Sequence, residues 1–279
     1  MSAPLRVEAP AKLNLSLRVV GRREDGHHEL DSVFVLLELA DRLLLMPGCS
    51  GLRVEGSADG VPIGVDNLAW RGLLAGLGDG QPELACLALE KRIPTAAGLG
   101  GGSSDAAAAW RLGRAWQGRP DAASAGDLAA LSTIGADVPF FASGVPAARI
   151  GGIGERVDPV PAEALEVVLV HPPFGLSTAA IFAELRPDEW GRLENDLLAP
   201  ARRLRPELDG LFAMVADAGG EPQLTGSGPT IFTLTDEPDR AAALAAALRE
   251  RGLATTHTRA RTAAAAIQTI EPTDEETSR

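Results

Sequence analysis

The chain has 279 residues, a formal net charge of −12 and 45% hydrophobic residues. This length supports a substantial core in about two domains, and the charge argues against a nucleic-acid surface, which needs clustered Lys and Arg. No long apolar run or secretion-signal pattern is present, so we expect a cytoplasmic protein without a membrane partner. Cys49 and Cys86 are too few and too far apart to predict a disulfide framework or a zinc site, and we expect two small buried side chains.

The first elements predicted along the chain are strands and one helix. Residues 5–20 alternate apolar and polar side chains, as a half-buried strand does, and residues 22–28 form a turn. Residues 30–46 predict further strands of the same sheet. Asp66 or Asn67 is positioned to cap a helix that runs through residue 77.

Residues 94–106 contain four glycines within five positions, followed by Ser103 and Ser104. They lie between a predicted strand (83–93) and a predicted helix (105–116) with one of these serines as N-cap. Glycine lets the backbone approach an oxyanion closely, and the helix adds the positive end of its dipole. The segment therefore predicts a cradle for a nucleotide phosphate, and it matches neither a Walker A loop nor G-x-G-x-x-G. The alternative is a glycine-rich surface turn before a capped helix.

The second half alternates strands and helices, which indicates an α+β domain. A short helix is predicted at 127–134, and Pro139 is expected to end helical structure and leave Asp137 near a turn. Prolines 159 and 161 mark a boundary, so we predict domains at 1–160 and 161–279. Predicted strands then cover 165–170, 223–224 and 230–235, and predicted helices cover 178–185, 195–204, 208–218 and 240–251. His171 and His257 are expected to be structural, and 271–279 to be frayed.

Lysine usage points to one position in particular. Of 26 basic residues, only Lys12 and Lys91 are lysines. Lysine provides a compact point charge where arginine provides a planar fork, so Lys12 is a candidate for a site that needs the former. The alternative is chance, since Lys91 shows that lysine occurs elsewhere.

Three blocks resemble the motifs of the GHMP small-molecule kinase superfamily: residues 9–15 (Ala-Pro-Ala-Lys-Leu-Asn-Leu), 94–106 and 224–230 (Leu-Thr-Gly-Ser-Gly-Pro-Thr). With residues 25–30, 134–139 and 195–197, they resemble the branch that acts on a cytidine diphosphate derivative of methylerythritol. The resemblance implies a two-domain GHMP kinase fold. Its parts are an N-terminal ribosomal-protein-S5-domain-2-like α/β domain and a C-terminal ferredoxin-like domain, with the active site between them.

The activity that this resemblance implies is transfer of the ATP γ-phosphoryl group to the 2-hydroxyl of the methylerythritol moiety, in the non-mevalonate isoprenoid pathway. By the same resemblance, Asp137 is the general base and Lys12 stabilises the developing alkoxide and the transferring oxygens. The alternatives are a surface Asp that caps a turn and a solvated Lys. Ser103 or Ser104, with Ser104 preferred, would hold Mg²⁺. We expect a monomer or weak homodimer whose partner is a small molecule.

The resemblance also assigns binding residues. His28 would read the cytosine, Phe182 would supply one stacking face, and His27 stands where many family members have Tyr. Imidazole stacks less extensively than phenol and ionises near neutral pH, so we expect cytidine binding to survive with more sensitivity to pH. A plain surface pair of histidines is the alternative. The other assigned substrate residues are Asn14, Thr178, Gly226 and Ser227. The assigned ATP residues are Asn67, Pro94, Thr95, Ala96, Ala97, Gly98, Leu99, Gly100, Gly101, Gly102, Ser103 and Ser104.

Two of these assignments have local alternatives, and the function has rivals. Asn67 near the adenine is equally explained as a helix cap, and the turn at 226–228 as a strand connection before Pro229. A rival function is a GHMP kinase for mevalonate, homoserine or a sugar, which would not need the block at 25–30. Another is a non-catalytic nucleotide sensor, against which the presence of both Lys12 and Asp137 argues.

Overall fold

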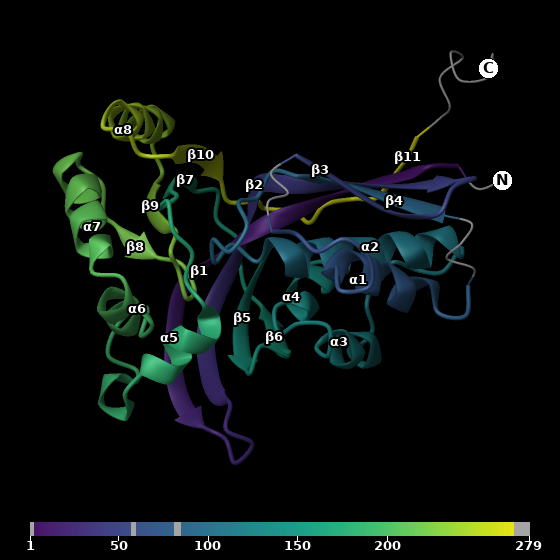
Figure 1. Ribbon diagram of the computed structural model, residues 1–279, viewed down its shortest axis with the longest axis horizontal. Helices are drawn as coiled ribbons and strands as arrows, with labels where there is room; N and C mark the ends of the chain where they lie inside the picture. The colour runs from purple at the N-terminus through teal and green to yellow at the C-terminus, as the bar shows by residue number, and fades with distance from the viewer. Residues whose placement is uncertain (1–2, 57–59, 81–84, 271–279) are drawn as a thin grey trace.

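The computed structural model describes residues 3–56, 60–80 and 85–270, which form two β-sheets with helices packed on each (Figure 1). The seven-stranded sheet has the order β11-β1-β2-β4-β3, with β5 paired to β2 and β6 paired to β5. Its strands are β1 (Leu5–Arg22), β2 (His28–Pro47), β3 (Gly51–Gly56), β4 (Ala85–Lys91), β5 (Ala147–Gly152), β6 (Arg156–Pro159) and β11 (Gln268–Thr269). The four-stranded sheet has the order β10-β7-β9-β8. Its strands are β7 (Glu166–Val170), β8 (Gln223–Leu224), β9 (Ile231–Thr235) and β10 (Thr255–Arg259).

The helices divide between the two sheets, and α1 and α2 cover one face of the larger sheet (Figure 1). The helices of the first half are α1 (Leu68–Leu77), α2 (Gly101–Trp116), α3 (Ala125–Leu131) and α4 (Val138–Ala142). Those of the second half are α5 (Thr178–Glu184), α6 (Leu198–Leu204), α7 (Glu207–Asp217) and α8 (Pro238–Glu250). The predicted α+β class is confirmed. Within the part of the chain described, no helix is long and apolar enough to cross a membrane.

Helices α1 and α2 touch backbone to backbone. A Cβ atom at Gly72 would overlap the carbonyl oxygen of Ala106, and one at Gly76 would overlap that of Trp110. Only glycine allows this approach, and the contact fixes α2 against α1. The N-terminus of α2, which follows the glycine loop, is thereby held in a defined place.

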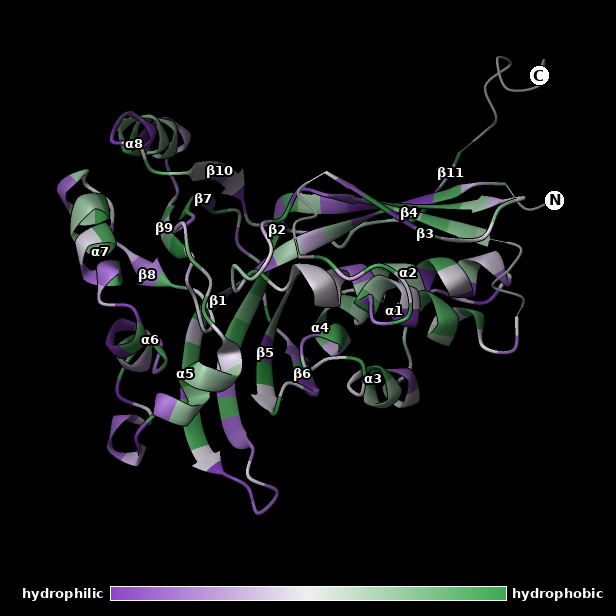
Figure 2. Ribbon diagram, in the orientation of Figure 1, coloured by the Kyte–Doolittle hydropathy of each residue, from purple (hydrophilic) through white to green (hydrophobic). Residues whose placement is uncertain are grey.

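Strands β1 and β2 are long enough to belong to both halves. Val7 and Ala9 pack with α1 and α2 in one apolar cluster, whereas Leu17 and Val19 pack with the residues of β7, β8 and β9 in another. The pairing of β1 with β2 shifts register between Pro10 and Lys12, and again further along the strand. Such irregularities bend a strand and re-aim its side chains. Residues 28–47 form one strand where the sequence predicted several, and the hairpin tip between β1 and β2 is hydrophilic (Figure 2).

Several local predictions need correction. Helix α2 begins at Gly101, and Gly100 caps it in the left-handed conformation, so neither Ser103 nor Ser104 is the N-cap. Pro139 lies in the first turn of α4 and does not end helical structure, because proline lacks only an N–H that has no partner in a first turn. Asp137 consequently lies directly before a helix.

The cysteine prediction was wrong about pairing: Cys86 is buried as expected and Cys49 is half-buried, but the two side chains are bonded. Cys49 and Cys86 form a disulfide with Cα atoms 5.2 Å apart. Strand β3 runs parallel to β4 and Gly51 pairs with Cys86, so the pairing brings Cys49 beside Cys86 despite 37 residues of separation. The predicted boundary at residue 160 stays a prediction, and β11 returns the chain to the first sheet beside β1. The predicted fraying of 271–279 lies outside the described residues.

Candidate active site

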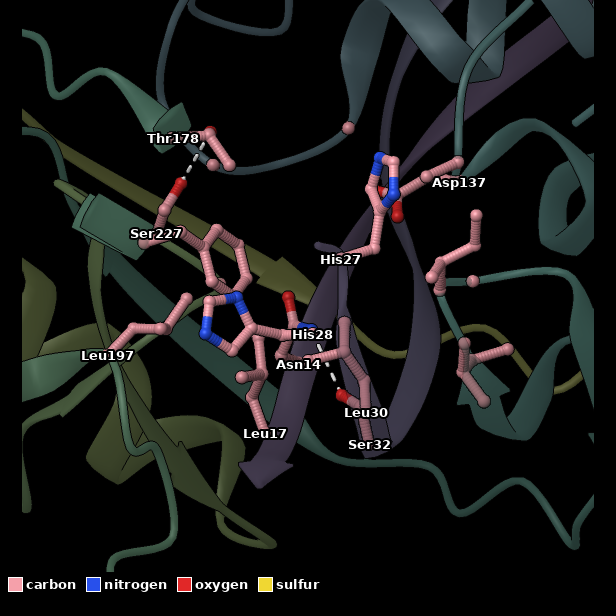
Figure 3. Close-up of a pocket in the computed structure, with 18 of the residues that line it drawn as sticks. Asn14, Leu17, His27, His28, Leu30, Ser32, Asp137, Thr178, Leu197 and Ser227 are labelled. Carbon is pink, nitrogen blue, oxygen red and sulfur yellow. Dashed lines mark hydrogen bonds between the residues drawn. The ribbon is translucent and has the colours of Figure 1, made fainter. Parts of the chain in front are cut away.

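A cavity of about 600 Å³ lies where β1 and β2 pass between the two halves, bounded by the turn before α4, helix α5 and the turn at 226–227 (Figure 3). It brings together residues that are far apart in the sequence. Both predicted catalytic residues and all predicted substrate residues line it. They are Lys12, Asn14, His27, His28, Asp137, Thr178, Phe182, Gly226 and Ser227.

Lys12 and Asp137 face each other at one end of this cavity. The Lys12 side chain is 6% exposed and its Nζ lies 3.5 Å from Asp137 Oδ2, whose side chain is 30% exposed. Lys12 Nζ also donates to Asn14 Oδ1 at 2.6 Å and lies 4.6 Å from the centre of the Phe34 ring. The buried ammonium of Lys12 can therefore stabilise negative charge that develops on an atom bound next to the accessible Asp137 carboxylate.

A second cavity, of about 420 Å³, lies along the glycine loop. It is lined by Asn67 and by residues 94–103, together with Lys91 and Asp105. Gly98 and Gly100 line both cavities, so the two spaces adjoin close to Lys12. The main-chain N–H of Lys12 donates to Leu99 O at 2.9 Å, which fixes β1 to the glycine loop. Predicted nucleotide residues and predicted catalytic residues thus meet at one junction.

The glycines of the loop are required by contacts within the protein itself. Gly98 and Gly100 have φ values of +76° and +71°, which side chains rarely adopt. A Cβ at Gly100 would lie 3.0 Å from Lys12 Cγ, and one at Gly98 would lie 2.8 Å from Gly228 O. Close packing of the loop against β1 and the turn at 225–228 therefore demands these two glycines, in addition to any ligand.

Ser103 and Ser104 differ in position. Ser103 lines the second cavity, whereas Ser104 is 1% exposed and does not line either cavity. The Ser104 hydroxyl has no hydrogen-bond partner among the described residues. Asn67 caps α1, with its Oδ1 accepting from Ala69 N at 2.8 Å, and it also faces the second cavity. The helix-cap interpretation of Asn67 is therefore correct, and a contact with a ligand stays a prediction.

A buried ion cluster, which we define as Lys91, Asp41 and Asp105, lies beneath the glycine loop. Lys91 Nζ bonds Asp105 Oδ2 at 2.7 Å and also contacts Asp41 Oδ2. Asp41 Oδ1 accepts the main-chain N–H groups of Arg92 and Ile93, so it anchors the end of β4 where the loop begins. Sequence reasoning missed this cluster because its members come from β2, β4 and α2.

The charge states within the cluster follow from its contacts. Burial opposes the charge of Lys91, but Asp105 and Asp41 outweigh it and raise the pKa of Lys91. Burial also raises the pKa of Asp105, against the pull of Lys91. Asp41 has main-chain donors in addition to Lys91, whereas Asp105 Oδ1 has no partner among the described residues. Asp105 therefore has fewer hydrogen-bond donors than Asp41 to offset its burial.

The opposite end of the first cavity is aromatic. The His28 ring stacks on Phe182, with centroids 5.2 Å apart, and meets Trp190 edge-on at 5.7 Å. Burial, with the charges of Arg22 and His27, lowers the pKa of His28. His27 is exposed and its Nδ1 lies 3.3 Å from Asp25 Oδ1. The structure thus separates the two histidines, and the neutral ring of His28 is the one packed against aromatic carbon.

Two of the predicted substrate residues contact each other, and two neighbouring residues, Ser32 and Trp190, were not identified from the sequence. Thr178 Oγ1 and Ser227 Oγ are 2.8 Å apart, which links α5 to the turn at 226–227 (Figure 3). Ser32, on β2, lines the first cavity and hydrogen-bonds Asn14. Trp190, in the segment after α5, gives no local signal of its contact with His28. His171 and His257 lie outside both cavities and contact Thr256 and Glu166, respectively, as structural residues do.

The fold and the two adjoining cavities define a class. The family models for the GHMP kinases N terminal domain and the GHMP kinases C terminal region match residues 67–145 and 179–254, respectively. A crystal structure of mevalonate kinase from L. major superposes with a TM-score of 0.66 over 93% of this chain and 96% of that one, at 14% identity. At that identity the likeness concerns the fold alone, which is the GHMP kinase fold.

Closer relatives narrow the class. A 4-diphosphocytidyl-2-C-methyl-D-erythritol kinase of Thermus thermophilus is 41% identical over 88% of this chain and 93% of its own length. One of Dinoroseobacter shibae is 41% identical over 90% of this chain and 92% of its own. A crystal structure of a 4-(cytidine 5'-diphospho)-2C-methyl-D-erythritol kinase has a TM-score of 0.76 and 37% identity, over 91% of this chain and 98% of that one. This chain belongs to the 4-diphosphocytidyl-2-C-methyl-D-erythritol kinase family.

Proposed function

We propose that this protein transfers the γ-phosphoryl group of ATP to the 2-hydroxyl of 4-diphosphocytidyl-2-C-methyl-D-erythritol, giving the 2-phosphate and ADP. The observation that carries the proposal is the Lys12 and Asp137 pair at the junction of two cavities. One cavity has the glycine loop of a nucleotide site, and the other has an aromatic end suited to a base. The names of the family members support the choice of substrate.

The chemistry of the pair follows from its charges. Asp137 is accessible from the first cavity and accepts the proton of the acceptor hydroxyl, which becomes the attacking oxygen. The Lys12 ammonium has three N–H groups; one is directed to Asn14 Oδ1 and one faces Asp137. The third has no hydrogen-bond or ion-pair partner among the residues that the structure describes, and it stabilises the negative charge that develops on the transferring oxygens.

The residues present fit a nucleotide with a divalent cation. Main-chain N–H groups of the loop and the first turn of α2 supply donors for phosphate oxygens. Within the described residues no group of His, Cys, Asp or Glu is arranged to hold a metal ion alone. Mg²⁺ bound with ATP would therefore take oxygens from the phosphates and the hydroxyl of Ser103, which lines the second cavity, whereas the expected preference for Ser104 does not fit its burial outside both cavities; the cation would neutralise phosphate charge.

The testing experiment compares four alcohols with Mg²⁺-ATP. ADP release is measured with 4-diphosphocytidyl-methylerythritol, mevalonate, homoserine and galactose, and phosphorus NMR locates the new phosphate. Turnover confined to the cytidine substrate, with phosphate on the 2-hydroxyl, is expected. Activity on another alcohol alone would replace the substrate and keep the kinase, and silence on all four would favour a nucleotide sensor.

A variant tests the role of the base. In Asp137→Asn the hydroxyl loses its proton acceptor, so we expect kcat to fall at least about a hundredfold. ATP binding, which uses the other cavity, should stay close to that of the unchanged protein. Full activity in this variant would remove Asp137 as the base. The cytoplasmic location and the monomeric or weakly dimeric state stay predictions.

A further inference from the structure

A chain of buried hydrogen bonds beneath Lys12 fixes the direction of one amide group. Asn14 Nδ2 and Ser32 Oγ are 3.0 Å apart, and Ser32 Oγ also contacts the carbonyl oxygen of Ser16. A carbonyl oxygen only accepts, so the single proton of Ser32 is directed to Ser16. Ser32 must then accept from Asn14, which places the amide NH₂ of Asn14 toward Ser32 and its oxygen toward Lys12.

The other side of Asn14 is held by a residue 211 positions away. The Thr225 hydroxyl accepts the main-chain N–H of Asn14 at 3.0 Å, and Asn14 Oδ1 lies 3.5 Å away as the acceptor for the proton of that hydroxyl. The same Oδ1 accepts from Lys12 Nζ at 2.6 Å. Thr225 is completely buried. It thus constrains both the backbone and the side chain of the residue that orients the Lys12 ammonium.

The turn that carries Thr225 is itself clamped by Asn195. Asn195 Nδ2 donates to Leu224 O at 2.7 Å and to Gly226 O at 2.9 Å, on the two sides of Thr225. Its Oδ1 accepts from Leu197 N at 2.9 Å, so each polar atom of the amide has a partner. A Cβ at Gly226 would lie 3.0 Å from Asn14 Oδ1, so the turn packs directly on the Asn14 amide.

We propose that Thr225 and Asn195 are positioning residues for phosphoryl transfer: they hold the Asn14 oxygen where it directs the Lys12 ammonium toward the reacting atoms. Neither residue lines the cavity that holds Lys12. They therefore act through Asn14 and not by touching the substrate. The inference rests on the proposed function, since it concerns the same lysine, and it assigns a role to the Asn-Asp-Leu block at 195–197.

The test uses three variants of buried threonines. Thr225→Val keeps the shape and removes the hydroxyl, whereas Thr225→Ser keeps the hydroxyl. Thr233→Val is the matched control, because Thr233 is also buried and its hydroxyl has no partner among the described residues. For each variant, kcat, the KM values for ATP and for the acceptor alcohol, and the thermal unfolding midpoint are measured.

We expect Thr225→Val to lower kcat about tenfold while KM for ATP changes less than about twofold. Thr225→Ser should recover most of kcat, and Thr233→Val should match the unchanged protein. Unchanged kcat in Thr225→Val, or an equal loss in Thr233→Val, would overturn the proposal. If Thr225→Val does not fold, Ser32→Ala replaces it, because loss of the Ser32 hydroxyl removes the hydrogen bond that fixes the direction of the Asn14 amide. Ser32→Ala should then give the same loss of kcat. An unchanged kcat in Ser32→Ala would overturn the proposal.

The same assay separates this inference from the proposed function. If the unchanged protein phosphorylates a different alcohol, the substrate assignment fails, and the variants are compared on that alcohol. A tenfold loss confined to Thr225→Val would then still support the positioning role. If the unchanged protein phosphorylates none of the four alcohols, both the function and the positioning role are overturned.

Discussion

The only two lysines of the chain lie on either side of the glycine loop, and they contrast sharply. Both are about 5% exposed. Lys91 is enclosed by two carboxylates in direct contact. Lys12 has a neutral amide as its near partner and a carboxylate at 3.5 Å that remains open to the cavity. Equal burial therefore accompanies two different electrostatic situations.

The difference separates a structural charge from a chemical one. The ammonium of Lys91 is satisfied within the protein, and it joins β2, β4 and α2 at the base of the loop. The positive charge of Lys12 is less fully compensated, because its near partner is a neutral amide and its one carboxylate partner is 3.5 Å away. Lys12 can therefore still attract an anion. Burial alone would not identify the functional lysine; the number and kind of its partners do.

The largest expected effect comes from Lys12→Met. Loss of the ammonium should lower kcat by about a hundredfold to a thousandfold, because the charge that faces Asp137 no longer stabilises the reacting oxygens. The free energy of unfolding should change by less than about 1 kcal/mol, since Asn14 Oδ1 keeps Thr225 and Asp137 keeps contact with water. Single-turnover ADP release and urea unfolding measure the two quantities. A large loss of stability would show that Lys12 resembles Lys91.

The same substitution at Lys91 should act on stability first. Lys91→Met leaves two buried carboxylates without a cation, which typically costs about 3–5 kcal/mol in the free energy of unfolding. Urea unfolding of this variant beside Lys12→Met gives the comparison directly. Equal stability of the two variants would contradict the assignment of Lys91 as the structural charge.

The smallest effect is expected for Asp105→Asn, and its sign depends on pH. Folding raises the pKa of Asp105 above its ordinary value of 3.8. The contribution of Asp105 to the free energy of unfolding is therefore fully present below pH 3.8, and it is lost as the pH rises through the raised pKa. The asparagine variant lacks this loss. Its stability relative to the unchanged protein, measured by urea unfolding at a series of pH values, should therefore increase as the pH rises above 3.8. A relative decrease would mean that Lys91 holds Asp105 ionised.

Local patterns predicted the elements around the glycine loop well. The strand before the loop, the Asn67 cap of α1 and most helices of the second half lie within a few residues of their predicted positions. The start of α2 differs by four residues because the backbone of Gly100 makes the cap, where a serine side chain was expected. Pro139 was assigned to a helix end because a proline inside an apolar segment gives the same signal as a proline at a helix start.

In the candidate site, too, residues within short motifs were predicted and contacts between distant residues were not. Motifs identified residues that line the two cavities, because each motif is a short contiguous block. The contacts of Lys91 with Asp41 and Asp105, and of Thr225 with Asn14, join residues 14 to 211 positions apart. No periodicity or spacing encodes such contacts, since they depend on how the strands pair. The disulfide between Cys49 and Cys86 was missed for the same reason.

The length of β1 determines how the molecule holds together as a whole. Its final third supplies Leu17 and Val19 to the core of the second half, and Leu17 exchanges main-chain hydrogen bonds with Glu194 and Asp196. The Asp196 carboxylate also accepts the N–H of Val19. The core of the second half therefore includes side chains from the first half, and a chain cut near residue 160 would separate residues that pack in one core. The two family models match separate stretches of the sequence, 67–145 and 179–254, whereas β1 contributes side chains to the cores of both halves.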